Sequence, residues 1–222
     1  SMREFQLQYD ALAGDFKNAA AFFTGCTVTN SHCGGNGDGA IEFNLGNVLL
    51  GVGTGDEAVR VFRHLYLSGI VADAGTLLPP ANYSSFDSLT SEGYFPKSKI
   101  SGASYVIGTS NPGVGNSSVN MSCYNGTAFT HAWTATEKVT SIQIWGTNSG
   151  NIAANCKGGI DAAKAYQIDK KIDDASDASG TITGADTGIV RTKDSATAGC
   201  VTGSAYNVGT TGPICTVALK IL

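Results

Sequence analysis

The chain has 222 residues, of which 14 % are charged and 42 % hydrophobic, and its formal net charge at pH 7 is −4. A weakly acidic chain without a basic stripe has no electrostatic basis for binding nucleic acid or an anionic membrane surface. Charged residues are scarce against the roughly one quarter that is usual in soluble domains. With 29 glycines and many Ser, Thr and Asn residues between apolar runs, the composition is typical of a loop-rich extracellular protein.

The first 23 residues predict helix, because apolar side chains recur at steps of three and four. Gly14 and Asp15 interrupt the pattern; Gly suits the end of one helix and Asp the start of the next, so two helices that share one apolar face are expected. A helix with one apolar face has to pack on another element, and a sheet is the natural candidate. The stripe consists of Phe5, Tyr9, Leu12, Phe16, Ala19 and Phe23.

A second helix is expected from about Thr54, after a loop over residues 24–55. Thr54 and Glu57 have the spacing of a capping box, and Gly69 is a typical C-terminal stop. The inner face of this helix is predicted to contain Ala58, Val61, Phe62, Leu65 and Tyr66.

Strands and a third helix follow. The third helix is predicted to be capped by Asp161 and to bury Ala162, Ala165, Ile168 and Ile172. Runs of strands without strict alternation with helices favour a single α+β domain over residues 1–222, with an antiparallel sheet and long disulfide-stapled loops. The expected strands are Tyr105–Ile107, Phe129–Thr134, Val139–Trp145 and Cys215–Leu222.

Six cysteines without a Cys-x-x-Cys pair indicate three disulfides in an oxidising compartment rather than a zinc or redox site. Six cysteines allow 15 connectivities. Because short loops close most readily, we favour Cys26–Cys33, Cys123–Cys156 and Cys200–Cys215, the alternative being that some are buried thiols.

The chain contains an ordered set of motifs. The first consists of Tyr9, Ala11, Leu12, Gly14 and Asp15, followed by Asn18-Ala19. The later ones are Asn36–Ile41, Glu57–Leu65, Ala165–Asp174 and the closing strand Cys215–Leu222. In this order they resemble the motifs of bacterial type IV pilins and type II secretion pseudopilins, the proteins with a prepilin-type N-terminal segment, and the first resembles the start of the soluble region of that class. The chain departs from the class at Ala13, Phe62 and Ala175, where Pro, Trp and Gly are usual.

The resemblance implies a pilin-like fold, in which an N-terminal helix packs on an antiparallel sheet. It also implies a structural filament subunit rather than an enzyme, located at the bacterial cell surface or in the periplasm. Its partners would be other pilin or pseudopilin subunits, and the inner membrane before assembly. The chain opens with Ser1-Met2-Arg3, typical of what remains after a tag is cleaved, so the apolar anchor helix is expected to have been removed.

The segment Asn36–Ile41 resembles the middle of a calcium loop, in which oxygen side chains alternate and a Gly allows a sharp turn. Asn36 and Asp38 would supply side-chain oxygens, Ala40 a carbonyl, and Glu42 or Glu57 a carboxylate. The competing interpretation is a plain turn, for which Asn-Gly and Asp-Gly are standard residues. Calcium is the only cofactor that the sequence suggests.

Other polar groups give weaker signals. The acidic residues Asp169, Asp173, Asp174 and Asp177 suggest either a second cation site or, more simply, a solvated helix end. The three histidines lack metal-ligand spacing along a helix, and for His64 a structural, hydrogen-bonded imidazole is expected.

The alternative function is a secreted glycan-binding adhesin or lectin-like module, whose partner would be a surface glycan or a host receptor. It rests on Tyr124, Trp133 and Trp145 among polar loops, although a sheet core is the more common place for such side chains. A secreted hydrolase has only the acidic residues in its favour, since no pattern arranges a nucleophile, a base and an oxyanion site.

Overall fold

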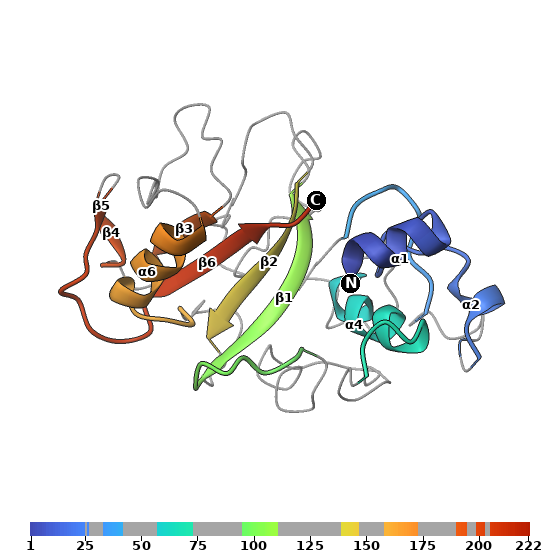
Figure 1. Ribbon diagram of the computed structural model, residues 1–222, viewed down its shortest axis with the longest axis horizontal. Helices are drawn as coiled ribbons and strands as arrows, with labels where there is room; N and C mark the ends of the chain where they lie inside the picture. Colours follow the sequence, from blue (N-terminus) through green and yellow to red (C-terminus); the bar gives the residue numbers. More distant parts are fainter. Residues whose placement is uncertain are drawn as a thin grey trace, which may run out of the picture.

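The structure, a computed structural model, describes residues 1–24, 26, 33–41, 57–72, 95–110, 139–146, 158–172, 190–194, 199–202 and 205–222. Within these ranges the protein is α+β: a central sheet separates an N-terminal helical group from a C-terminal one (Figure 1). The helices are α1 (Met2–Tyr9), α2 (Ala19–Phe22), α4 (Glu57–Leu67) and α6 (Ala162–Ile172).

The central sheet has four antiparallel strands in the order β1-β2-β6-β3. Their bounds are β1 (Ala103–Ser110), β2 (Val139–Gly146), β6 (Cys215–Lys220) and β3 (Val190–Asp194). A separate hairpin pairs β4 (Val201–Thr202) with β5 (Ala205–Tyr206). The predicted antiparallel sheet is therefore confirmed, as are its strands near Tyr105, Val139 and Cys215; the predicted strand Phe129–Thr134 lies outside the described residues.

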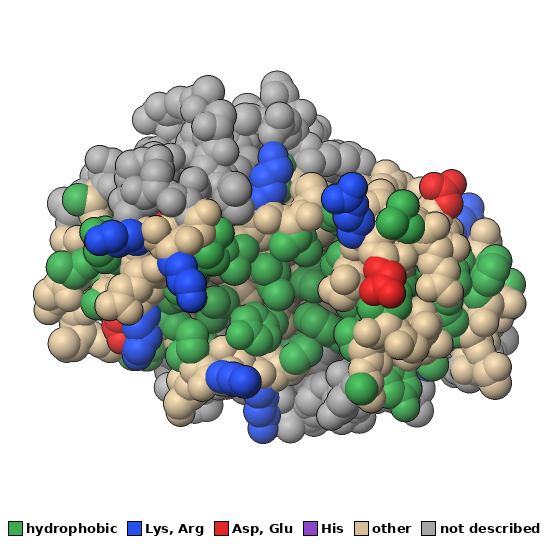
Figure 2. Space-filling model, in the orientation of Figure 1, with side chains coloured by type: hydrophobic (Ala, Val, Ile, Leu, Met, Phe, Trp, Pro, Cys, Tyr) green, Lys and Arg blue, Asp and Glu red, His purple; other side chains and the backbone are tan. Residues whose placement is uncertain are grey.

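The two faces of the sheet differ in exposure. Register places Tyr105 of β1, Ile142 of β2 and Leu219 of β6 on one face, where all three side chains are half-buried. On the opposite face Val106 and Ala218 are fully buried. Figure 2 shows hydrophobic side chains gathered over β1, β2 and β6, in the space between the two helical groups. Helices therefore cover the ends of the first face and leave its centre partly open.

The N-terminal aromatic stripe is the core of the first helical group. Phe5, Phe16 and Phe23 are buried in one cluster with Val106 and Ile107 of β1, so the expected shared apolar face is present. The helix boundaries differ from the prediction: α1 ends at Tyr9 because Asp10 takes a left-handed conformation with φ 51°. Asn18 occupies the N-cap position of α2, so Asp15 is not the cap that the sequence suggested.

Helix α4 packs against β1 and beside α1 (Figure 1). Ala58, Val61 and Leu65 are buried as predicted, whereas Tyr66 is 36 % exposed and does not belong to the inner face. The helix stops where expected, since Gly69 has φ 74° and the N–H of Ile70 returns to the carbonyl of Leu65.

Helix α6 covers the other end of the sheet and packs against β3, β5 and β6. Asp161 caps it as predicted: its Oδ1 accepts the N–H of Lys164 at 2.8 Å. Ala162 and Ala165 are buried against Val217, but Ile172 is 47 % exposed because it lies in the last turn. No helix in the described ranges combines the length and the apolar character needed to cross a membrane.

Candidate functional site

Asp15 holds the segment 33–41 through its backbone amides. Oδ1 of Asp15 accepts the N–H of Gly37 at 2.6 Å and that of Asp38 at 3.2 Å, and Oδ2 accepts the N–H of Gly39 at 2.8 Å. Burial raises the pKa of the Asp15 carboxyl above its usual value, while the hydrogen bonds from Gly39 and Gly37 oppose that rise. One carboxyl group thus fixes three consecutive amides of a loop more than 20 residues away in the chain.

Glu57 extends the same arrangement from the first turn of α4. Its Oε1 accepts the N–H of Asn36 at 2.7 Å, and the side chain is fully buried. Four successive amides, those of residues 36–39, are therefore held by two carboxyl groups from different parts of the chain. We call the place where Asp15, Glu57 and His64 meet residues 33–41 the loop junction.

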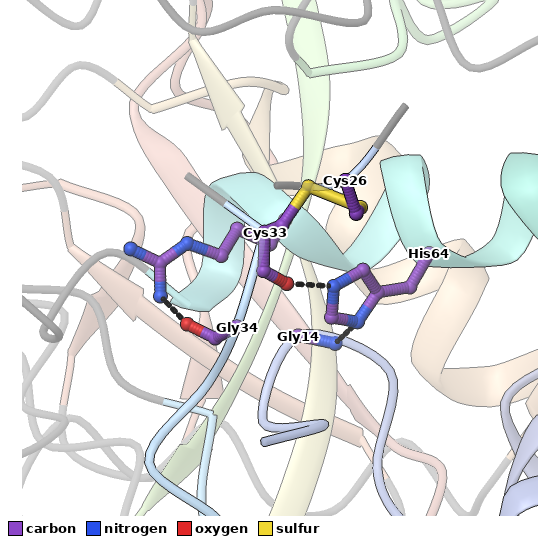
Figure 3. The surroundings of a disulfide bond; sticks show 6 residues. Gly14, Cys26, Cys33, Gly34 and His64 are labelled. Atoms are coloured by element: carbon purple, nitrogen blue, oxygen red, sulfur yellow. Dashed lines mark hydrogen bonds between the residues drawn. A yellow bond between two sulfur atoms is a disulfide. The ribbon is translucent and has the colours of Figure 1, made fainter. Parts of the chain in front are cut away.

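His64 joins the start of the loop to the turn after α1 (Figure 3). The N–H of Gly14 donates to Nδ1 at 2.9 Å, and Nε2 lies 2.6 Å from the carbonyl oxygen of Cys33. This pair of partners requires a neutral ring with its proton on Nε2. Burial, followed by the positive charges of Arg60 and Arg63, lowers the pKa of His64 to about 4 although the bond to Cys33 opposes it. With both ring nitrogens bonded to backbone, the imidazole acts as a structural connector.

Arg60 and a disulfide complete the start of the loop. Arg60 is only 3 % exposed, and its Nη1 donates to the carbonyl of Gly34 at 2.7 Å. Cys33 is bonded to Cys26, with a Cα–Cα distance of 5.5 Å (Figure 3). The loop is therefore anchored covalently just before the residues that Asp15 holds.

The far end of the loop is attached to the sheet. The N–H of Ile41 donates to Oγ1 of Thr109, and the N–H of Thr109 donates to the carbonyl of Ile41. Thr109 Oγ1 also shares a hydrogen bond with Thr140 Oγ1, 2.9 Å away on β2, in which either hydroxyl can donate. The loop junction thereby links the N-terminal helices to β1 and β2.

Two glycines allow backbone segments to approach each other closely at the loop junction. A Cβ atom on Gly35 would lie 2.3 Å from backbone atoms of Asp15, and one on Gly14 would lie 2.7 Å from the carbonyl oxygen of Glu57. Gly14 also has φ 100°, which side chains disfavour. Both positions therefore need glycine for the loop junction to close.

The residues proposed for calcium form internal turns of the loop. Oδ1 of Asn36 accepts the N–H of Asp38 at 2.8 Å, and Oδ1 of Asp38 accepts the N–H of Ala40 at 2.9 Å. Glu42 lies outside the described residues. In the part of the chain that the structure describes, no group of three or more His, Cys, Asp or Glu side chains is arranged to hold a metal ion.

The other predicted site residues fall elsewhere. Asp169 is fully buried and its Oδ2 accepts the hydroxyl of Tyr206 at 2.7 Å, which makes it a core residue of the C-terminal group rather than part of a solvated helix end. The remaining acidic residues of that set, Asp173, Asp174 and Asp177, lie outside the described ranges. So do Tyr124, Trp133 and the side chain of Trp145, on which the glycan-binding hypothesis rests.

Two of the three expected disulfides fall within the described residues, and both have the expected pairing. Besides Cys26–Cys33, Cys200 is bonded to Cys215 with a Cα–Cα distance of 5.2 Å. The second bond links the β4 hairpin to the start of β6. Cys123 and Cys156 lie outside the described residues, so their pairing stays a prediction.

The sequence did not indicate that Asp15 and Glu57 hold backbone amides. It predicts a helix start for both, where acidic residues are common, and for Glu57 also a calcium ligand beside Asn36–Ile41. A signal existed in the spacing of Asn36, Gly37, Asp38 and Gly39, since a glycine-rich turn exposes successive amides that suit a carboxylate. What the loop junction does chemically is to hold backbone in place.

Comparison of the chain with models of protein families, with curated proteins and with solved structures found no match.

Proposed function

We propose that this chain is the globular head of a pilin-like protein, a structural subunit of a type IV pilus or a type II secretion filament. In this proposal a longer N-terminal apolar helix anchors the protein in the inner membrane before assembly and mediates subunit packing in the filament. The head then lies at the cell surface or in the periplasm.

The observation that carries the proposal is the loop junction. The motifs with pilin-like resemblance lie far apart in the sequence, around Gly14-Asp15, Asn36–Ile41 and Glu57–His64. In the structure they contact one another through the bonds of Asp15, Glu57 and His64. Three short motifs that meet at one place in the structure are a more specific sign of a pilin-like protein than any one of them alone. Their contact therefore supports the resemblance.

The chemistry of the loop junction also favours a structural role. Its buried polar groups bind backbone amides and carbonyls, and both nitrogens of His64 are occupied in this way. Two disulfides, at Cys26–Cys33 and Cys200–Cys215, fit a protein that works in an oxidising compartment.

The direct test is the full-length gene of the source bacterium. The sequence encoded upstream of Met2 is expected to contain an apolar helix of about 20 residues. Filaments sheared from the cells should contain the protein, and a version without the upstream helix, exported by a separate signal, should be missing from them. A gene that begins at Met2, or sheared filaments that lack the intact protein, would overturn the proposal.

The glycan-binding alternative predicts a different result. Binding on a glycan array should then be lost in Trp133→Ala or Trp145→Ala, while a filament role predicts no such binding by a non-adhesive subunit. Binding by the head alone together with absence from sheared filaments would favour the alternative.

A further inference from the structure

We propose that Asn36 is a latent deamidation site, and that Asp15 suppresses deamidation by accepting a hydrogen bond from the amide nitrogen of Gly37. The inference rests on the loop junction alone and does not depend on the filament proposal. It concerns the dipeptide Asn36-Gly37, in which the following residue has no Cβ atom to hinder approach of its nitrogen to the asparagine side chain.

The reaction is intramolecular. The amide nitrogen of Gly37 loses its proton and attacks Cγ of Asn36, so that a new C–N bond closes a five-membered ring. The bond from Cγ to the side-chain nitrogen breaks, and that nitrogen leaves as ammonia. Water then opens the succinimide at one of its two carbonyl carbons and yields aspartate or isoaspartate at position 36. No other co-reactant is needed.

In the folded protein three hydrogen bonds oppose the attack. The nitrogen that must attack donates its proton to Oδ1 of Asp15 at 2.6 Å. The amide of Asn36 is held by Glu57 at 2.7 Å, and Oδ1 of Asn36 is engaged with the N–H of Asp38 at 2.8 Å. Turning the Gly37 nitrogen toward Cγ breaks the first bond and disturbs the others, so the reaction rate should follow the opening of the loop junction.

Water can reach the segment, because Gly37, Asp38 and Gly39 are exposed and Asn36 is half-buried. Burial is therefore not what protects the site; the hydrogen bonds are. Once formed, an extra carboxylate at position 36 would lie beside Asp15 and Asp38, and like charges at such distance oppose closure. Deamidation at Asn36 would consequently make a transient opening of the loop junction permanent.

The chain contains its own reference, since Asn125-Gly126 is the same dipeptide at another position. Both sites can be followed in one sample by peptide mass spectrometry in ¹⁸O-labelled water, which marks each succinimide that has been hydrolysed. Asp15→Asn keeps the size of the side chain but cannot accept three N–H bonds on its two terminal atoms. Asp161→Asn makes the same chemical change at the acid that caps α6 and serves as the matched control.

The native protein should deamidate at Asn36 at least about tenfold more slowly than the urea-unfolded chain. The attack first has to break a hydrogen bond to a charged carboxylate, and the strength of such a bond corresponds to a rate factor of about ten or more. Asp15→Asn should remove most of that protection without changing the rate at Asn125, and Asp161→Asn should change neither. Equal rates in native and unfolded protein, or a folded Asp15→Asn protein as slow as the unaltered one, would overturn the proposal.

A variant that does not fold would lose the protection of Asn36 whatever Asp15 does, and a second measurement then decides. Hydrogen exchange of the Gly37 amide in the unaltered native protein reports directly on the hydrogen bond from this amide to Asp15. Protection of this exposed amide is expected, and exchange at the rate of an unstructured amide would refute the role given to Asp15.

Discussion

Acid should destabilise this protein through the imidazole of His64. The ring is fully buried, and its Nδ1 accepts the N–H of Gly14. Burial of the ring, with a smaller effect of the positive charges of Arg60 and Arg63, lowers the pKa of His64 to about 4. Protonation of Nδ1 also removes the acceptor for the N–H of Gly14. In the unfolded chain the imidazole has its ordinary pKa of 6.5. Between these two values the unfolded state binds more protons, so stability decreases as pH falls.

The size of the effect follows from the two pKa values. A difference of roughly 2.5 units at 1.36 kcal/mol each gives about 3 kcal/mol, complete below pH 4 and negligible above pH 7. About 2 kcal/mol of this should already be lost at pH 5. The raised pKa of Asp15 makes stability change with pH in the opposite direction to His64. The lowered pKa of Asp161 affects stability only at pH values below 3.8, the usual pKa of that group.

The assay is urea unfolding followed by circular dichroism at pH values from 7.5 to 4, on the protein and on two variants that cannot titrate. His64→Asn keeps an acceptor near the position of Nδ1, and His64→Gln keeps a donor near that of Nε2. Each variant starts less stable because it loses one bond. Its stability should change less with pH, so the gap to the unaltered protein should shrink by about 2 kcal/mol between pH 7 and 5.

Because Asp15 and the surface acids are common to all three proteins, their contributions cancel in that difference. Parallel curves for the protein and both variants from pH 7.5 to 4 would show that His64 titrates alike in the folded and unfolded states. The described network of Gly14, His64 and Cys33 would then be wrong.

Three further outcomes are expected. Gly35→Ala should lower the free energy of unfolding by about 1–3 kcal/mol, because its Cβ would lie 2.3 Å from the backbone of Asp15, and thermal unfolding should show a drop of several degrees. Tyr206→Phe should cost about 1.5–3 kcal/mol by urea unfolding, since it removes the hydroxyl 2.7 Å from the buried carboxylate of Asp169; an unchanged midpoint would contradict this. Calcium binding to the segment Asn36–Ile41 predicts a higher unfolding temperature with calcium than with chelator, absent in Asp38→Ala, whereas equal temperatures would make it a plain turn.

Within the residues that the structure describes, local sequence patterns were sufficient to predict most of the helices and strands. The alternation of Val217, Ala218 and Leu219 predicted β6, and Asp161 at the start of an apolar periodic segment predicted α6 with its cap. These signals are local, because period and capping depend on residues a few positions apart. The same locality explains the error at Tyr66, since helical spacing alone does not say how wide the buried face is.

The loop junction could not be predicted in the same way. Asp15 and Gly37 are separated by 22 residues, and Glu57 and Asn36 by 21. An acidic residue beside a helical segment predicts a cap from local sequence, whereas the tertiary packing of the N-terminal helical group brings these carboxyl groups to the loop. For His64 the expectation of a structural imidazole was correct, but its partners Gly14 and Cys33 depend on the same packing.

The order of strands in the sheet has a consequence for when the protein can fold. Strand β6 lies between β2 and β3, yet it is the last of them along the chain. The four-stranded sheet therefore cannot be completed until residue 220 has been synthesised, whereas β1 and β2 can pair with each other earlier. The bonds of Asp15, Glu57 and His64, by contrast, lie within the first 64 residues, and the disulfide Cys26–Cys33 closes a separation of only 7. Synthesis should accordingly yield an N-terminal part that is able to organise early, followed by a sheet that is completed only when β6 is available.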